Sequence, residues 1–68
     1  MRIDLALKYL CLAKSRSMAK TLCDNRRVLV NGRHVRPAAP VDAGDRITVQ
    51  YRARTVSVRL VQVPRKQL

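Results

Sequence analysis

Apolar residues near the start of the chain recur with the spacing of a helix. Ile3, Leu7 and Leu10 follow one another three or four residues apart, so they fall on one side of a helix that we expect over residues 4–13. Asp4 stands at the start of this stretch, where an acidic side chain is a favoured N-cap. The pattern therefore predicts a first helix that is capped by Asp4 and buries one apolar side.

A second helix is predicted over residues 16–25. Ser15 precedes it and can accept a hydrogen bond from the free amides of its first turn. Asn25 is expected to end it in the left-handed conformation. Its buried side is expected to consist of Met18, Ala19, Leu22 and Cys23.

The hydrophobic period changes from helical to alternating after residue 27. Val28–Val30 and residues 33–35 are predicted to be short strands. Asn31-Gly32 between them is a strong hairpin signal, because both residues tolerate a positive φ. Two further stretches alternate and are predicted to be strands, residues 46–49 and 55–61.

The order of these elements predicts the fold class. Helices followed by short strands indicate an α+β protein, in which two short N-terminal helices pack on a small antiparallel sheet of three to five strands. With 68 residues, the chain has room for one domain. We expect this domain to span residues 1–62, followed by a short basic C-terminal tail at residues 63–68.

The charge of the chain indicates the kind of partner. Fifteen Lys and Arg, most of them Arg, face four Asp, which gives a net charge of +11 and a pI near 11.4. Self-repulsion of this size destabilises a compact state, so it indicates a polyanionic partner. Nucleic acid is favoured over a membrane, because the longest apolar run is far below the ~20 residues of a spanning helix. No signal peptide is expected either.

The start of the second predicted helix is positively charged, where a helix tuned for stability would carry negative charge. Lys14 and Arg16 flank Ser15, and cations at a helix N-terminus oppose its dipole. Free amides, hydroxyls and cations together suit a phosphate. Lys20 lies one turn after Arg16 on the same face. The pattern predicts an RNA-binding site, extended around the hairpin by Arg26, Arg27 and Arg33.

Catalytic and metal-binding chemistry is not expected. His34 stands alone, and the four Asp form no pair suited to two-carboxylate chemistry. Cys11 and Cys23 lack metal-site spacing and are expected to be buried, reduced thiols. We therefore predict no enzyme activity, metal, cofactor or small-molecule substrate. The aromatic residues are Tyr9, expected to be partly buried, and Tyr51, so recognition of folded RNA is favoured over stacking on single-stranded bases.

A longer set of residues resembles the S-four RNA-binding domain, the module named after the fourth protein of the small ribosomal subunit. Within that family, the chain is most similar to bacterial ribosome-associated quality-control factors and to a small heat-shock protein of the same domain type. The resemblance implies that Arg2, Asp4, Arg16 and Lys20 lie on the RNA face. It is carried by Arg2-Ile3-Asp4, Leu7, Ser15-Arg16, Ala19, Leu22-Cys23, Val28, Val30-Asn31-Gly32, Val35, Pro37, Val41, Gly44-Asp45, Ile47 and Val49.

The resemblance also implies a function. The protein would bind ribosomal RNA and tRNA on obstructed large ribosomal subunits, as a cytoplasmic monomer that acts in the rescue of stalled nascent chains. Two alternatives stay open: an RNA-targeting module that works with an RNA-modifying enzyme, and a general or structural ribosome-associated protein. One position departs from the family, which usually has Gly where Arg26 stands. Either Asn25 takes the left-handed conformation or the turn differs.

Overall fold

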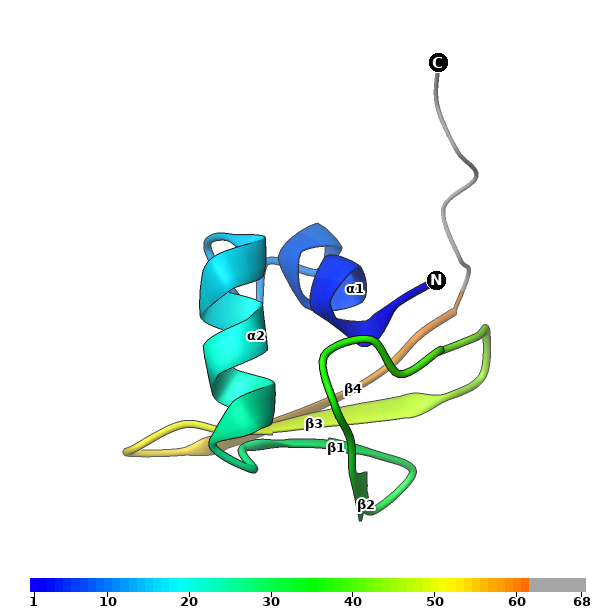
Figure 1. Cartoon of the computed structure of the whole chain (residues 1–68). Helices are drawn as coiled ribbons and strands as arrows, with labels where there is room; N and C mark the ends of the chain where they lie inside the picture. The colour runs from blue at the N-terminus through cyan, green and yellow to red at the C-terminus, as the bar shows by residue number, and fades with distance from the viewer. Residues whose placement is uncertain (62–68) are drawn as a thin grey trace.

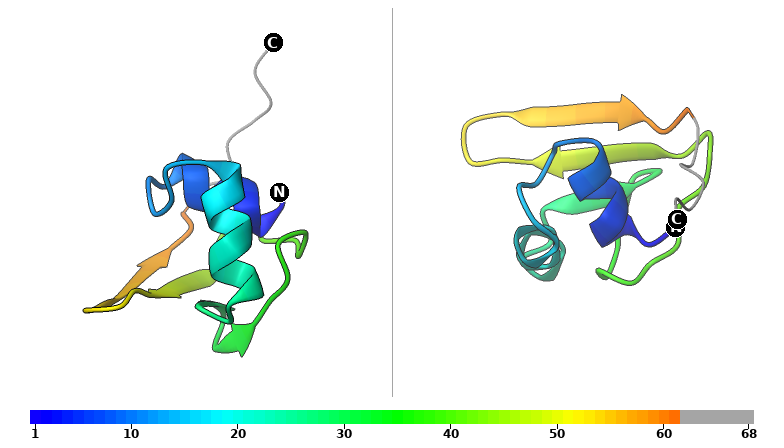
Figure 2. Two further views of the ribbon diagram at one scale, coloured as in Figure 1. Left: turned by 60° about the vertical axis from the view of Figure 1, so that its left-hand side comes forward. Right: turned by 90° about the horizontal axis from the view of Figure 1, so that it is seen from above.

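Two helices cover one face of a four-stranded antiparallel sheet (Figures 1 and 2), which confirms the predicted α+β fold. The computed structural model describes residues 1–61, and the predicted basic tail lies outside them. The elements are α1 (Ile3–Tyr9), α2 (Arg16–Asp24), β1 (Val28–Val30), β2 (Arg33–His34), β3 (Arg46–Gln50) and β4 (Thr55–Arg59).

The strand order is β2-β1-β3-β4, and each pair of neighbours is antiparallel. The predicted turn at Asn31-Gly32 is confirmed, since both residues have a positive φ, 53° and 84°. Val30 pairs with Ile47 across β1 and β3. This register places the alternating apolar residues of the strands on the side that the helices cover.

The core lies between the helices and the inner face of the sheet. Because the chain has no Phe or Trp, aliphatic and small side chains fill it. Within residues 1–61, no helix covers the other face of the sheet (Figure 1). The buried apolar residues are Ile3, Ala6, Leu7, Ala13, Ala19, Cys23, Val28, Val30, Val41, Ile47, Val49 and Leu60.

The start of α1 is held by a distant loop. A helix leaves its first backbone N–H groups without intrahelical partners. Here the amide of Ile3 donates to the carbonyl of Ala39 at 2.8 Å, and the amide of Asp4 to that of Pro37 at 3.2 Å. The amide of Leu5 donates to Asp4 Oδ1 at 2.7 Å. Asp4 therefore lies inside the first turn, and its prediction as the N-cap is wrong.

Both helices end with a non-glycine residue in the left-handed conformation. Cys11 has φ 61° and Arg26 has φ 59°. The amide of Arg26 donates to the carbonyl of Cys23, and that of Arg27 to Leu22, which is the hydrogen-bond pattern of a Schellman motif. Asn25 instead keeps a φ of −88°. The predictions that α1 continues to residue 13 and that Asn25 terminates α2 are thus wrong.

Three predictions of burial are also wrong. Met18, Tyr9 and Cys11 are exposed. Both helices are short, and only the sides that face each other and the sheet are covered. On α2 these buried positions are Ala19 and Cys23.

Candidate nucleic-acid interface

One buried carboxylate holds two arginine side chains at the start of the helical layer. Asp4 Oδ2 accepts from Arg2 Nη2 at 3.0 Å and from Arg16 Nη2 at 3.4 Å, and Asp4 Oδ1 accepts from Arg2 Nε at 3.2 Å. The Asp4 side chain is only 5% exposed, whereas each arginine side chain is 49% exposed. One negative charge thus orients two positive charges, and half of each arginine stays accessible.

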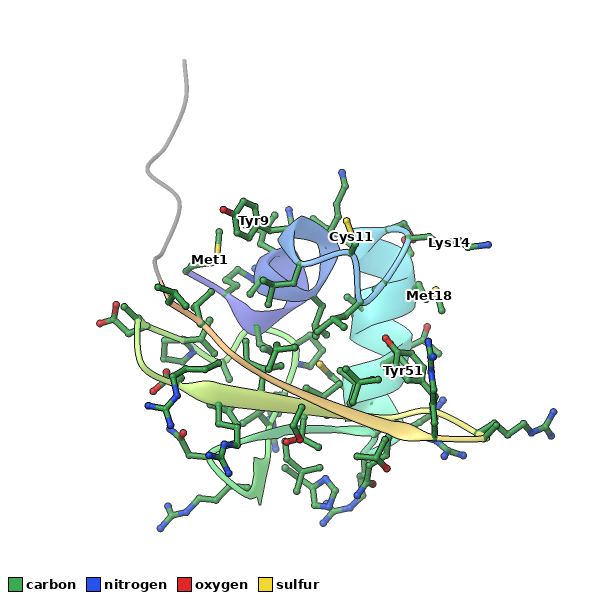
Figure 3. All side chains as sticks on the ribbon, turned by 180° about the vertical axis from the view of Figure 1, so that it is seen from behind. Met1, Tyr9, Cys11, Lys14, Met18 and Tyr51 are labelled. Atoms are coloured by element: carbon green, nitrogen blue, oxygen red, sulfur yellow. The ribbon has the colours of Figure 1, made fainter. Side chains whose placement is uncertain are left out.

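The start of α2 adjoins this cluster. Ser15 Oγ accepts from the amide of Met18 at 3.1 Å, which confirms Ser15 as the N-cap. Within residues 1–61, the amides of Arg16 and Ser17 donate to no acceptor. Lys14 extends from the loop between the helices, away from the body of the domain (Figure 3). Amides without an acceptor, together with the cation of Lys14, are a favourable environment for a phosphate group at a helix start.

Lys20 continues the positive surface along α2. Its Nζ lies 3.4 Å from Asp24 Oδ2, and the lysine side chain is 66% exposed. Exposed pairs of this kind contribute little to stability, in the range of about 0–1 kcal/mol. The pair therefore leaves Lys20 free to exchange its carboxylate for a phosphate oxygen.

An open groove of about 430 Å³ extends this surface towards the sheet. Pro37 connects the groove to the arginine cluster around Asp4. Its carbonyl accepts from the amide of Asp4, and Pro37 also lines the groove. Arg26, a predicted site residue, is also at the groove. The complete lining consists of Cys23, Asp24, Arg26, His34, Val35, Arg36 and Pro37.

Arg26 is the one groove residue that was predicted as a site residue, and the other six were not, among them His34 and Arg36. The sequence indicates an extended backbone at Arg36, because the residue before a proline is held extended. Only the fold shows that Arg36 lies against α2. Two predicted site residues, Arg27 and Arg33, lie neither at the groove nor at the start of the helical layer. Arg27 Nη1 donates to the carbonyl of Gln50 at 3.4 Å, and Arg33 lies on the exposed strand β2.

The buried thiol of Cys23 is not an activated nucleophile. Burial raises the pKa of Cys23 to about 11, with smaller contributions from the charges of Asp4 and Asp24. Cys23 is therefore protonated at neutral pH. Residues 1–61 contain no group of three His, Cys, Asp or Glu side chains that could hold a metal ion. No helix in this part of the chain is long and apolar enough to cross a membrane.

Fold and surface together define a class of small α+β domains in which a two-helix layer with a basic start covers one face of an antiparallel sheet. The S4 domain matches residues 1–47. The chain belongs to the S4 domain family, as the sequence resemblance implied.

Relatives with this domain have been described in several bacteria. The chain is 35% identical over 60 residues to the RQC P-site tRNA stabilizing factor of Bacillus subtilis, a match that covers 88% of this chain and 70% of that protein. It is 33% identical over 63 residues to the factor of the same name from Halalkalibacterium halodurans, covering 93% and 72% of the two chains.

A solved structure has the same fold. The trimeric structure of Vibrio cholerae heat shock protein 15 superimposes with a TM-score of 0.87 at 23% identity. The match covers 94% of this chain and 65% of that chain. At this level of identity the likeness concerns the fold alone.

Proposed function

We propose that the protein is a non-catalytic RNA-binding factor of ribosome-associated quality control. In this proposal it binds ribosomal RNA and tRNA on large ribosomal subunits that are obstructed by peptidyl-tRNA. It acts in the cytoplasm as a monomer, and residues 1–62 form its single domain. The names of its relatives and the net charge of +11 support this function.

The observation that carries the proposal is the arginine pair held by Asp4. A guanidinium group that is oriented before binding loses less conformational freedom when it meets a phosphate. Arg2 and Arg16 are oriented by a carboxylate that is itself buried and fixed by the amide of Leu5. The cluster therefore presents positive charge in a defined geometry, beside the free amides of α2.

The remaining predicted site residues extend the same surface. Lys14 and Ser15 directly precede α2, Lys20 lies within it, and Arg26 lies at the groove below it. The helical layer would thus contact successive phosphates of a folded RNA. Arg27 and Arg33 would add contacts at the periphery of this surface.

A charge reversal at Arg16 tests the proposal. Large ribosomal subunits carrying peptidyl-tRNA are sedimented with the wild-type protein, with Arg16→Glu and with Arg52→Glu. Arg52 is exposed between β3 and β4 and belongs to no proposed contact, so it controls for the change in net charge. We expect Arg16→Glu to lose co-sedimentation and Arg52→Glu to keep most of it. Equal co-sedimentation of all three proteins would refute the assignment of the helical layer.

A further inference from the structure

The uncovered face of the sheet carries a second basic hollow, separate from the helical layer. Its volume is about 520 Å³. The helices lie on the opposite side of the sheet, so an RNA bound to them leaves this face open (Figures 1 and 2). The residues that line it are Asn31, Gly32, Gly44, Arg46, Thr48, Ser57 and Arg59.

Two arginines face each other across the strands of this hollow. Arg46 on β3 is the register partner of Arg59 on β4. Directly opposed side chains of an antiparallel pair lie on the same face, with Cβ atoms about 4.5–5.5 Å apart, and like charges at such positions repel each other. Both residues are exposed. A strand pair selected for stability alone would place opposite charges here.

None of the four aspartates neutralises this pair. Asp4 is occupied by Arg2 and Arg16, and Asp24 by Lys20. Asp45, next to Arg46, accepts from the side chain of Asn31 at 3.1 Å and from the amide of Asp42 at 2.8 Å.

The fourth carboxylate, Asp42, accepts from the amide of Ala43 at 2.9 Å. Among residues 1–61, neither arginine of the hollow forms an ion pair. Two opposed positive charges are therefore left without a side-chain counter-ion.

Hydroxyl groups continue the row of polar side chains. Thr48 and Ser57 are also register partners, and their oxygen atoms lie 2.9 Å apart. They point to the same face as Arg46 and Arg59, because residues two apart on a strand share a face. Guanidinium groups followed by hydroxyl groups are the side chains that contact the phosphates and sugars of nucleic acids.

We infer that this outer face binds a second RNA backbone segment, so that the domain bridges two RNA segments, one on each side of its sheet. The inference rests on the proposed RNA binding of the helical layer and adds a second, independent contact. An RNA backbone fits better than an acidic protein, because the hollow offers hydroxyl donors and opposed guanidiniums but no apolar side chain.

A bridging assay tests this second contact. A short RNA hairpin is fixed to beads, the protein is added, and capture of a second, fluorescent hairpin is measured. The variants are Arg46→Thr with Arg59→Thr, Arg46→Lys with Arg59→Lys, and Arg16→Glu. Threonine suits a strand, and it removes the repulsion, so a thermal melt is expected to show an intact fold.

We expect the threonine pair to bind the fixed hairpin but to lose at least about tenfold in capture of the second one. The lysine pair should keep most of the capture. For the second RNA, each lost phosphate contact should make the decrease of log affinity with log salt less steep by about 0.7–0.9.

Undiminished capture by the threonine pair would overturn the second contact while leaving the proposed function intact. Capture of polyglutamate in place of the second hairpin would also overturn the second RNA contact and would indicate an acidic protein as the ligand of the outer face. If the wild-type protein failed to bind the fixed hairpin at all, the proposed function itself would fail.

Discussion

At the scale of single residues, Arg26 combines a conformational cost with a position at the groove. Its φ of 59° is one that side chains with a Cβ adopt at a cost of about 1–2 kcal/mol. Glycine would avoid the strain. The arginine nevertheless lies at the groove with Asp24 and Arg36. Strained residues of this kind concentrate at binding sites, which is consistent with a contact that outweighs the cost.

Replacing Arg26 should therefore separate stability from binding. We expect Arg26→Gly to be more stable than Arg26→Ala by about 0.5–1 kcal/mol, because the released strain exceeds the greater unfolded-state entropy of glycine. Urea denaturation of both variants measures the difference, and alanine controls for loss of the guanidinium. Both variants should bind RNA more weakly than the wild type. Equal stability of the two variants would contradict the strain.

Local chemistry explains which single residues could be predicted from the sequence. Ser15 and the Asn31-Gly32 turn were correct, because their side chains and backbone preferences act on neighbours in the chain. The prediction of Asp4 as the N-cap is wrong, since the partners of the first amides of α1 come from residues 37 and 39. Asn25 was wrong because the Schellman bonds place the left-handed residue one position later.

At the scale of elements, one corner joins the β1–β2 hairpin to the start of β3. Asn31 Oδ1 accepts from the amide of Arg46 at 2.9 Å, and its amide group donates to Asp45 Oδ1. Asp45 also accepts from the amide of Asp42. These hydrogen bonds, first that from the Asp42 amide and then that from Asn31, lower the pKa of Asp45 below its ordinary value of 3.8.

This corner should make stability depend on pH in the acid range. A carboxyl whose pKa is lowered in the folded state stabilises the protein at pH values above its pKa in the unfolded state. This contribution is lost as the pH falls below 3.8. We expect Asp45→Asn to be less stable than the wild type near neutral pH, with the difference shrinking in acid. Urea midpoints across this range measure it. Asp24→Asn, which removes a carboxylate from an exposed pair, is the control, and parallel curves for Asp45→Asn and the wild type would argue against the corner.

The order and type of the elements could be predicted because the hydrophobic period changes once, after residue 27. Their ends could not, because they depend on contacts between distant segments. The first helix ends four residues before its predicted C-terminus, because Cys11 has the left-handed conformation. The last strand ends at Arg59, although alternation continues to Val61, because its partner β3 begins only at Arg46. The amide of Leu60 still donates to the carbonyl of Asp45 at 2.8 Å, but the chain before Asp45 is a turn.

At the scale of the whole molecule, positive charge surrounds the fold. The three ion pairs within residues 1–61 occupy two of the four aspartates. Much of the net charge of +11 is therefore available for phosphates on both sides of the sheet. The helical part of this surface could be predicted from Arg16 and its neighbours, but the Arg46–Arg59 pair depends on strand register, which composition and spacing do not determine.

The affinity for RNA should accordingly fall steeply with salt. The slope of log affinity against log salt is negative. We expect Lys20→Gln to make it less steep by about 0.7–0.9, the value of one phosphate contact. Lys8→Gln, at the exposed end of α1, should leave the slope nearly unchanged. Fluorescence anisotropy with a labelled RNA hairpin over a range of KCl concentrations measures both slopes. A salt dependence that is less steep for Lys8→Gln than for Lys20→Gln would assign the phosphate contact to Lys8 instead.

The buried carboxylate of Asp4 has a practical consequence for how variants are ranked. Changing Asp4 to Asn makes the protein one unit more positive, so its indiscriminate attraction to any RNA should grow. The same change releases Arg2 and Arg16 from their shared anchor, so the choice between cognate and unrelated RNA should become poorer. A screen that measures RNA affinity alone would rank such a variant above the wild type. Competition with unrelated RNA would reveal its lower specificity.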